Sequence, residues 1–340
     1  MRPLLAWSQD DILANRSGYH VLADYLDADK VCAAREETAS GLPRLWSRVR
    51  RRFSFSRWCT TGSFAVEKAV RWSLASKPGQ LVHFLWCDRD LAFLDLGASR
   101  GLRLIGTFHQ CPDDLPQVIR RTSTLRHFAA ILLMSETQRA YFLQNRVPAE
   151  RLHVVRHGVD VDHFTPASLD APEEFMVLAV GGTRRDYAQM RAVAEFFVDQ
   201  TRIRFVFVGP EDKGHHFAGL GNVSYRIRVS DAELLDLSRR ASCFLHLPEN
   251  ATANNALLEA MACGAPVVSQ RVGGVPEYVT DECATLSAAG DVVGTVKAIN
   301  DLAASRSRQQ EMRHAARAHA LKHDWRIIAK ETAEIYRQAA

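Results

Sequence analysis

The stretch SCFLHLPENATANNALLEAMACGAPVVSQRVGGVPE, residues 242–277, places a helix-length segment between two short apolar runs. The runs SCFLHLP (242–248) and APVVSQ (265–270) have the length and apolar content of buried parallel strands. Between them, Asn254 or Asn255 is suited to cap a helix that ends in Gly-Ala-Pro. This order of strand, helix and strand predicts a βαβ unit, and therefore an α/β fold.

Further apolar, β-branched runs recur along the chain, separated by segments long enough for helices. They are LVHFLW (81–86), LRLIGTF (102–108), AAILLM (129–134), LHVVRHG (152–158), FMVLAVGG (175–182) and IRFVFVGP (203–210). The stretch TPASLDAPEE (165–174) interrupts this series, has no periodicity, and predicts an exposed linker.

A chain of 340 residues suits two domains better than one. With the linker as the boundary, we expect an N-terminal domain over 1–165 and a C-terminal domain over 166–320. The last segment, 321–340, has apolar residues at helical spacing on Trp325, Ile328, Ala329, Ile335 and Tyr336, with Thr332 completing the stripe. We expect it to form a helix that packs back toward the N-terminal domain.

The composition is that of an ordinary globular protein, with 47% hydrophobic and 24% charged residues. The seven cysteines are odd in number and form no C-x-x-C pair, so neither a disulfide framework nor a zinc site is predicted. The N-terminus lacks the order of a signal peptide, and no apolar run approaches the length of a membrane span. We therefore expect a cytoplasmic protein.

Positive charge is concentrated in the first half of the chain, where residues 1–165 hold 23 Lys and Arg against 17 Asp and Glu. The segment LPRLWSRVRRRFSFSRW (42–58) places an apolar helical stripe beside arginines. The stripe consists of Leu42, Leu45, Trp46, Val49 and Phe53. Such a segment predicts peripheral contact with an anionic membrane at its inner face, and the alternative is a helix that packs on its own domain. No nucleic-acid-binding motif is present, so no nucleic-acid partner is expected.

A candidate diphosphate site follows the run FMVLAV. Gly181 and Gly182 let the backbone approach a ligand, and Arg184 and Arg185 are suited to bidentate phosphate contact. Ligands of parallel α/β sheets bind outside the carboxyl ends of the strands, which is where this segment lies. The alternative is a glycine turn with two solvated arginines.

Glu259 is the second candidate, because a carboxylate near the start of a helix can accept hydrogen bonds from both hydroxyls of a ribose. The alternative is that Glu259 only complements the helix dipole. The following turn, Gly273 and Gly274 ahead of Pro276 and Glu277, predicts a second helix start nearby.

The passage LLEAMACGAPVVSQRVGGVPEYV (257–279) resembles the nucleotide-sugar signature of the GT-B glycosyltransferases, specifically the retaining family 4. Other stretches are similar to that family as well: SGYHVLADYL, GTFHQCPDD, VVRHGVDVDHF, VSDAELLDLSRRASCFLHLP and HDWRIIAKETAEIY. The resemblance implies a GT-B architecture, in which two Rossmann-like domains with parallel sheets face a central cleft.

The same resemblance implies a retaining, metal-independent hexosyltransferase that moves a sugar from a nucleoside-diphosphate sugar to an acceptor hydroxyl. The donor is a co-substrate, and no other cofactor is expected. A glycan or a lipid-linked acceptor, as in polysaccharide biosynthesis, would lie on the N-terminal domain. Carried over to this sequence, Arg185 and His109 are the catalytic residues. The donor-binding residues are Gly18, Gly182, Arg184, Lys213, Glu249, Asn254, Asn255, Leu258 and Glu259.

The chain departs from the family pattern at two positions. Where the family has an acid eight residues before the ribose-binding glutamate, this chain has Ala251, so Asn254, Asn255 or Glu249 would take over its role. The family's lysine after the arginine is absent, and Lys213 is the candidate substitute. These departures keep two alternatives open: a degenerate, non-catalytic sugar-nucleotide-binding protein, and an isomerase of the sugar-nucleotide 2-epimerase type.

Paired acids separated by one residue would be expected in a metal-dependent GT-A enzyme, because they can hold a divalent ion with a diphosphate. Three such pairs occur: Asp27 with Asp29, Asp88 with Asp90, and Asp160 with Asp162. The pattern is short and recurs by chance, so no metal site is predicted.

Overall fold

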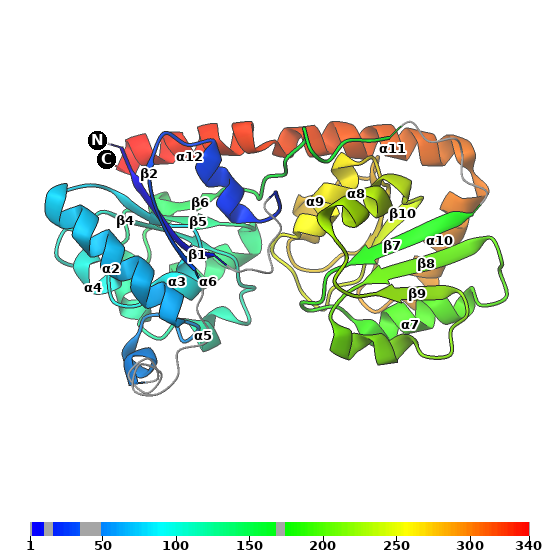
Figure 1. The fold of residues 1–340 in the computed structure, drawn as a ribbon, viewed down its shortest axis with the longest axis horizontal. Coiled ribbons are helices and arrows are strands. Elements are labelled where there is room, and N and C mark those ends of the chain that lie inside the picture. The colour runs from blue at the N-terminus through cyan, green and yellow to red at the C-terminus, as the bar shows by residue number, and fades with distance from the viewer. Residues whose placement is uncertain (1, 10–15, 35–48, 168–173, 340) are drawn as a thin grey trace. The chain divides into compact units, whose positions relative to one another are not determined.

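The computed structural model describes residues 2–9, 16–34, 49–167 and 174–339. The chain divides into two compact units, of which unit 1 comprises residues 1–157 and 325–340, and unit 2 comprises residues 158–324. Each unit contains a six-stranded sheet (Figure 1). The boundary lies between His157 and Gly158, ahead of the predicted linker, and the segment from Trp325 onward belongs to unit 1.

Unit 1 is built on a parallel sheet in the order β2-β1-β3-β4-β5-β6. The strands are β1 (Leu4–Gln9), β2 (Asp29–Ala34), β3 (Val82–Phe84), β4 (Leu104–Phe108), β5 (Ala130–Leu133) and β6 (Leu152–Val154). Its α-helices are α2 (Thr61–Ser76), α3 (Cys87–Asp90), α4 (Asp95–Ala98), α5 (Leu115–Val118), α6 (Arg139–Gln144) and α12 (Trp325–Ala339). Short 3₁₀ turns complete the unit: η1 (Tyr19–Asp24), η2 (Thr122–His127), η3 (Glu136–Gln138) and η4 (Ala149–Arg151).

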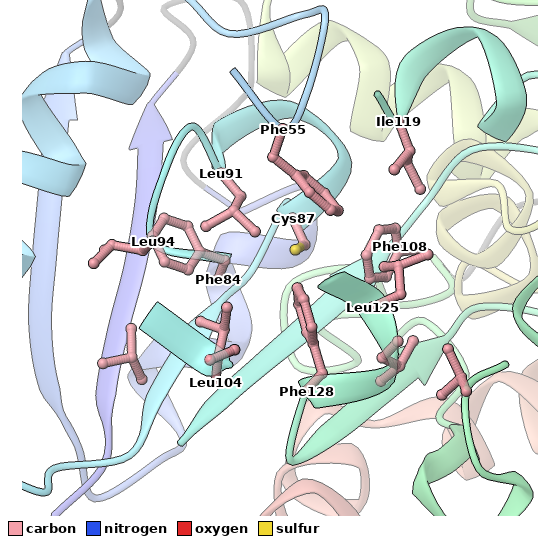
Figure 2. Close-up of a cluster of buried hydrophobic side chains, with 14 of the residues drawn as sticks. Phe55, Phe84, Cys87, Leu91, Leu94, Leu104, Phe108, Ile119, Leu125 and Phe128 are labelled. Atoms are coloured by element: carbon pink, nitrogen blue, oxygen red, sulfur yellow. The ribbon is translucent and has the colours of Figure 1, made fainter. Parts of the chain in front are cut away.

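One face of this sheet is covered by a large apolar cluster, part of which Figure 2 shows. Phe55, Phe84, Phe108 and Phe128 are buried in it and come from four different segments. Each fully buried phenylalanine contributes on the order of 1.5–3 kcal/mol by removal from water. Helix α2, which also packs on this cluster, begins where the Thr60 side chain accepts a hydrogen bond from the Ser63 N–H in a capping box.

Helix α12 buries the predicted stripe against unit 1. Its buried residues are Trp325, Ile328, Ala329, Thr332, Ile335 and Tyr336, so the predicted stripe is confirmed. The hydroxyl of Tyr336 lies 2.5 Å from Nδ1 of His83, a buried residue of β3. This contact fixes α12 against the sheet.

Unit 2 is built on a second parallel sheet, in the order β12-β11-β10-β7-β8-β9. The strands are β7 (Phe175–Val180), β8 (Ile203–Val208), β9 (Val223–Arg226), β10 (Cys243–His246), β11 (Val267–Gln270) and β12 (Ala284–Ser287). The helices are α7 (Tyr187–Phe196), α8 (Asp231–Arg240), α9 (Asn255–Ala262), α10 (Val292–Ala304) and α11 (Arg306–Ala320), with the 3₁₀ turns η5 (Glu211–Phe217), η6 (Val275–Glu277) and η7 (Leu321–His323).

Strand β7 shows how unit 2 buries both faces of its sheet. Phe175, Val177 and Ala179 pack in one cluster with residues of α7 and α10, while Leu178 packs in another with residues of α8, α9 and α11. Because successive side chains of a strand point to opposite faces, a sheet covered on both sides needs a continuous apolar strand. The run FMVLAV meets that need, and unit 2 is a three-layer α/β/α sandwich.

All eight apolar runs that the sequence predicts as strands are strands in the structure: β3, β4, β5, β6, β7, β8, β10 and β11. Four more were not predicted, namely β1, β2, β9 and β12. Three of these, β2, β9 and β12, lie at the edges of their sheets, where polar residues are tolerated and the apolar pattern is weak.

The predicted amphipathic segment 42–58 is described only from residue 49 onward, so Leu42, Leu45 and Trp46 lie outside the described residues. Val49 and Phe53 are exposed, as the membrane interpretation requires. Phe55, in contrast, is completely buried in the core of unit 1. The segment therefore turns inward after Phe53.

Candidate functional site

Two loops of unit 2 are joined at the carboxyl edge of its sheet. The N–H of Glu249 donates to the carbonyl of Arg184 at 2.9 Å, and the N–H of Asp186 donates to the carbonyl of Leu247 at 3.0 Å. Strands β7 and β10 are parallel neighbours, so the loops that follow them emerge side by side. The structure thereby brings Arg184, Arg185 and Glu249 together, although they are far apart in the sequence.

Gly181 and Gly182, at the start of the first loop, are each required for a different structural reason. Gly181 has φ of 101°, a conformation that side chains rarely adopt. A Cβ on Gly182 would lie 2.3 Å from Cγ of Pro210, which follows β8, so any side chain there would displace that residue. The backbone of this loop is therefore held close to the loop after β8.

Arg185 lies under this loop and is buried. Its guanidinium donates to the carbonyl of Val180 at 2.9 Å and to that of Thr183 at 3.2 Å. Burial lowers the pKa of Arg185 to about 10, so the side chain still carries its charge at neutral pH. The alternative of a solvated arginine is therefore wrong for Arg185.

Arg184 and Lys213 complete the predicted cationic set. Arg184 is partly buried and has φ of 50°, a strained conformation for a residue other than glycine. Lys213 lies in η5 after β8, and its Nζ is 3.0 Å from Oδ2 of Asp212. Because Lys213 and Asp212 are largely exposed, this ion pair contributes little to stability.

Helix α9 begins farther before Glu259 than a position near the helix start implies. Asn254 is the N-cap, because its side chain accepts a hydrogen bond from the N–H of Leu257 at 2.9 Å. Asn255 is the first helical residue, and no acid lies in the first turn. Glu259 therefore lies beyond the first turn, where the dipole no longer accounts for a carboxylate. It is also buried, and a buried carboxylate needs polar partners.

The prediction that Leu258 contacts the donor is wrong as far as its side chain is concerned. That side chain is wholly buried in the apolar cluster under α9, and its N–H donates to the carbonyl of Asn254 within the helix. Leu258 supports the helix that presents Glu259 and is not itself exposed to a ligand.

Ala251, the position where the resemblance implies an acid, is buried against the glycine turn. Its carbonyl accepts a hydrogen bond from the N–H of Gly274 at 2.8 Å. A Cβ on Gly273, whose φ is 51°, would lie 2.3 Å from that same carbonyl. Of the predicted replacements for the acid, Asn254 uses its side-chain oxygen as the helix cap, whereas Glu249 is exposed.

In unit 1, His109 follows β4 and is held by two hydrogen bonds. Its backbone N–H donates to Oδ2 of Asp88 at 2.7 Å, and its ring Nε2 lies 2.8 Å from the carbonyl of Leu85. Because a carbonyl only accepts, Nε2 carries the proton and Nδ1 carries the lone pair. Burial is the main reason that the pKa of His109 is lowered to about 3, so the ring is neutral at physiological pH.

A cluster of rings surrounds His109, which the sequence did not predict. Trp86 stacks on it with a centroid distance of 5.6 Å, and Tyr19 meets it edge-on at 4.9 Å. Tyr19 also contacts the rings of His157 and Trp325. Gly18, a predicted site residue, lies directly before Tyr19 and has φ of 102°. Only Trp86 has a local signal, as an aromatic residue at the end of the apolar run LVHFLW.

The three pairs of acids have local roles in unit 1 and unit 2. Asp88 accepts hydrogen bonds from the N–H groups of His109 and Gln110, and Asp90 accepts from the N–H and hydroxyl of Ser8. Asp160 accepts from the N–H of Asp162, and Asp29 pairs with Lys77. Among the described residues, no group of three or more His, Cys, Asp or Glu could hold a metal ion.

Residues 175–305 match the profile of the family described as "Glycosyl transferases group 1". Unit 2 contains a group 1 glycosyltransferase domain. The matched range includes Gly182, Arg185, Glu249 and Glu259, so the joined loops and α9 belong to the group 1 domain.

Among curated proteins, the chain is similar to the sulfoquinovosyl transferase SQD2 of Arabidopsis thaliana, with 29% identity over 52% of this chain and 38% of that protein. It is also similar to the D-inositol 3-phosphate glycosyltransferase of Streptomyces scabiei, with 26% identity over 67% of this chain and 58% of that protein. The chain thus spans about two fifths to three fifths of the length of these relatives.

Two solved structures show the same fold over nearly the whole chain. Sucrose-phosphate synthase from Thermosynechococcus elongatus aligns with a TM-score of 0.73 and 17% identity, over 99% of both chains. HepE from Anabaena, in complex with UDP and glucose, aligns with a TM-score of 0.64 and 16% identity, over 94% of this chain and 89% of that one. The predicted GT-B fold is confirmed by these likenesses and by the two parallel sheets.

Proposed function

We propose that the protein is a retaining, metal-independent glycosyltransferase of family 4, which transfers a sugar from a nucleoside-diphosphate sugar to an acceptor hydroxyl. The observation that carries this proposal is the group 1 domain, in which a buried cationic Arg185 and a buried Glu259 both follow the carboxyl edge of one sheet. HepE has been solved with UDP and with UDP-glucose, which makes UDP-glucose the first donor to test.

In this mechanism Glu259 accepts hydrogen bonds from the ribose hydroxyls, and Arg185 stabilises the departing diphosphate. Arg184, Gly182 and the N-terminus of α9, with Asn254 and Asn255, provide further contacts to the donor. Charge stabilisation of this kind is strongest when the cation is fixed in advance, and Arg185 is fixed by its bonds to Val180 and Thr183. Lys213 and Glu249 would contact the diphosphate and the donor sugar.

His109 is proposed to contact the sugar and the acceptor hydroxyl. Its neutral ring and the lone pair on Nδ1 suit it to accept a hydrogen bond from a hydroxyl group. The acceptor would bind to unit 1 and is proposed to be a glycan or a lipid-linked molecule.

A membrane-associated acceptor is supported by an exposed surface of unit 1. Phe53 and Trp58 are exposed, with 60% and 45% of their surface accessible, and they are flanked by exposed Arg51, Arg52 and Arg57. Aromatic rings beside arginines suit the interface of an anionic membrane. No helix within the described parts of the chain could cross a bilayer. We therefore propose a cytoplasmic protein that binds peripherally to the inner face of a membrane.

The proposed function is tested by incubating the protein with a panel of sugar nucleotides and acceptors. Release of nucleoside diphosphate together with a glycosylated product is the expected result, and retention of the anomeric configuration is read by NMR. An epimerised donor would instead assign the isomerase function, and binding without turnover would assign the non-catalytic function.

A further inference from the structure

A cavity in unit 2, with a volume of about 740 Å³, lies at the opposite edge of the sheet from the residues of the proposed donor site. Phe175 and Ile203, the first residues of β7 and β8, line it, as does Ser242, which directly precedes β10. Arg185 and Glu249, in contrast, follow the carboxyl ends of these strands. A strand of six residues such as β7 spans about 20 Å, so the cavity is separate from the proposed donor site.

The cavity is strongly basic. Arg202, Arg240, Arg306 and Arg313 line it, against Glu174 as the acid among its lining residues. Arg240 forms an exposed ion pair with Asp236 at 3.3 Å, which contributes little. Within the described parts of the chain, neither Arg202, Arg306 nor Arg313 forms an ion pair. Among the residues that the structure describes, the positive charge of this cavity is therefore largely uncompensated.

Arg313 is fixed in position on one wall. Its guanidinium donates to the carbonyl of Arg239, in the last turn of α8, at 3.3 Å. It also donates to the carbonyl of Ala241, which directly follows α8, at 2.8 Å. Burial lowers its pKa from the usual value, which is the cost of holding a cation in a partly desolvated site. An anion in the cavity would offset that cost.

Neutral polar groups alternate with the arginines. The side chains of Gln200, Asn300, Gln309 and Gln310 also line the cavity. Gln309 is held in place, because its amide nitrogen donates to the carbonyl of Leu302 at 2.9 Å. Carboxamides both donate to and accept from hydroxyl groups, whereas guanidinium forks match the oxygens of a phosphate.

We propose that this cavity binds a phosphorylated, polyhydroxylated small molecule of the sugar-phosphate class, at a site separate from the donor site. Arg202, Arg306 and Arg313 hold the phosphate, and the carboxamides hold the hydroxyl groups. The volume falls within the range of about 300–1,000 Å³ that is common for small-molecule sites.

The first experiment measures binding of glucose 6-phosphate to the full chain by calorimetry, at constant ionic strength and with UDP present at high concentration. UDP keeps phosphate ligands out of the proposed donor site. We expect glucose 6-phosphate to bind, inorganic phosphate to bind more weakly, and glucose not to bind. Absence of glucose 6-phosphate binding overturns the proposal, as does equal binding of inorganic phosphate.

The second experiment places the site with two variants whose folding is checked by circular dichroism. The double variant Arg202→Gln/Arg306→Gln is expected to lower the affinity for glucose 6-phosphate by about tenfold or more, the scale of a lost charge-assisted hydrogen bond. The matched control Arg308→Gln removes an exposed arginine from the same helix, α11, outside the lining residues. It should leave the affinity unchanged.

If the double variant and Arg308→Gln lose affinity for glucose 6-phosphate equally, the proposal is overturned, because a general effect of charge would explain both losses. Unchanged affinity in the double variant would do so as well, since the ligand would then bind elsewhere. Both conclusions rest on the affinity of each variant for glucose 6-phosphate relative to the wild type. They are therefore valid even if the protein transfers sugar from no donor.

Discussion

The N–H of Glu249 donates a hydrogen bond of 2.9 Å to the carbonyl of Arg184, and this bond joins the loop after β7 to the loop after β10. Arg185 follows directly and lies beneath the joined loops. The backbone on either side of Arg185 is therefore held by a segment that it meets only in the folded chain. This relationship gives Arg185 both a structural and a proposed ligand-binding role, and the two can be separated by experiment.

Replacing Arg185 with alanine is expected to weaken binding of UDP far more than binding of uridine, because only UDP carries the diphosphate that the guanidinium would contact. Calorimetry with both ligands measures the difference, and Arg308→Ala is the control for general charge. The variant also loses the bonds to Val180 and Thr183, so its melting temperature should fall. If the affinities for UDP and uridine fall equally, Arg185 stabilises the fold and does not contact the diphosphate.

For Glu259→Gln, we expect UDP affinity to fall by about 1.5–3 kcal/mol, the contribution of hydrogen bonds to a charged group. A glutamine keeps the size of the side chain, so the packing of α9 should be retained. Glu282→Gln, which changes an exposed acid of unit 2, is the matched control. Unchanged UDP affinity in Glu259→Gln would remove this residue from the donor site.

The sequence predicts the fold better than the site because buried strands have a local signature. FMVLAV and IRFVFV are covered on both faces, so every residue in them except Arg204 is apolar, and the runs are visible without any partner. Edge strands such as β9 have exposed polar residues and lack that signature. The strand β1, LLAWSQ, is internal, but its apolar run ends after four residues at Ser8 and Gln9, so its signature is weaker.

The site depends on contacts that no local pattern contains. The sequence predicts Asn254 or Asn255 as the helix cap, because capping acts within one turn, and Asn254 is the cap in the structure. The bonds from Arg185 to Val180 and Thr183, and the Tyr19 ring against His109, depend instead on how loops close in three dimensions. Leu258 shows the opposite difference, because its place inside the signature predicts a donor contact, whereas its side chain packs in the core.

Sugar transfer is expected to continue in the presence of EDTA. The proposed stabilisation of the diphosphate comes from Arg185 and backbone N–H groups, and Asp88 and Asp90 are already engaged by N–H groups of the protein. The measurement is the rate of UDP release before and after chelation. Loss of activity that added Mg²⁺ or Mn²⁺ restores would contradict a metal-independent mechanism.

The triple variant Arg51→Gln/Arg52→Gln/Arg57→Gln should lose co-sedimentation with acidic vesicles at low salt, because these exposed arginines flank Phe53 and Trp58. Arg50 is left unchanged, since its guanidinium lies 4.4 Å from the centre of the Phe64 ring and supports the fold. Attraction to anionic lipid is screened over about 10 Å at 0.1 M salt, so salt should release the wild type.

The control for membrane binding is Arg71→Gln/Arg100→Gln/Arg146→Gln, which removes the same charge from other exposed positions of unit 1. It should sediment with acidic vesicles as the wild type does. If both triple variants sediment equally well, the basic surface does not bind lipid, and a soluble acceptor is favoured. UDP affinity should be unchanged in both, because Arg185 and Glu259, the residues proposed to bind UDP, belong to unit 2.

Stability should fall as the pH decreases below about 6.5, because His109 is neutral in the folded state with a pKa of about 3. The unfolded state takes up a proton near pH 6.5 and the folded state does not, so acid favours unfolding over this window. The free energy of unfolding should therefore decrease between pH 7.5 and pH 5. In His109→Gln this decrease should be smaller by up to about 2 kcal/mol. Urea unfolding at the two pH values measures this, and an unchanged decrease would contradict it.

The turn at Gly273 and Gly274 constrains how the proposed donor site can be re-engineered. Because the carbonyl of Ala251 is bonded to Gly274 and lies against Gly273, an acid introduced at position 251 would bury a charge at a position only 9% exposed. A single Ala251→Glu change would therefore cost stability before it could select a sugar. A mutant library for new donor specificity should vary Glu249 and Asn255 first, and change position 251 only together with residues 272–275.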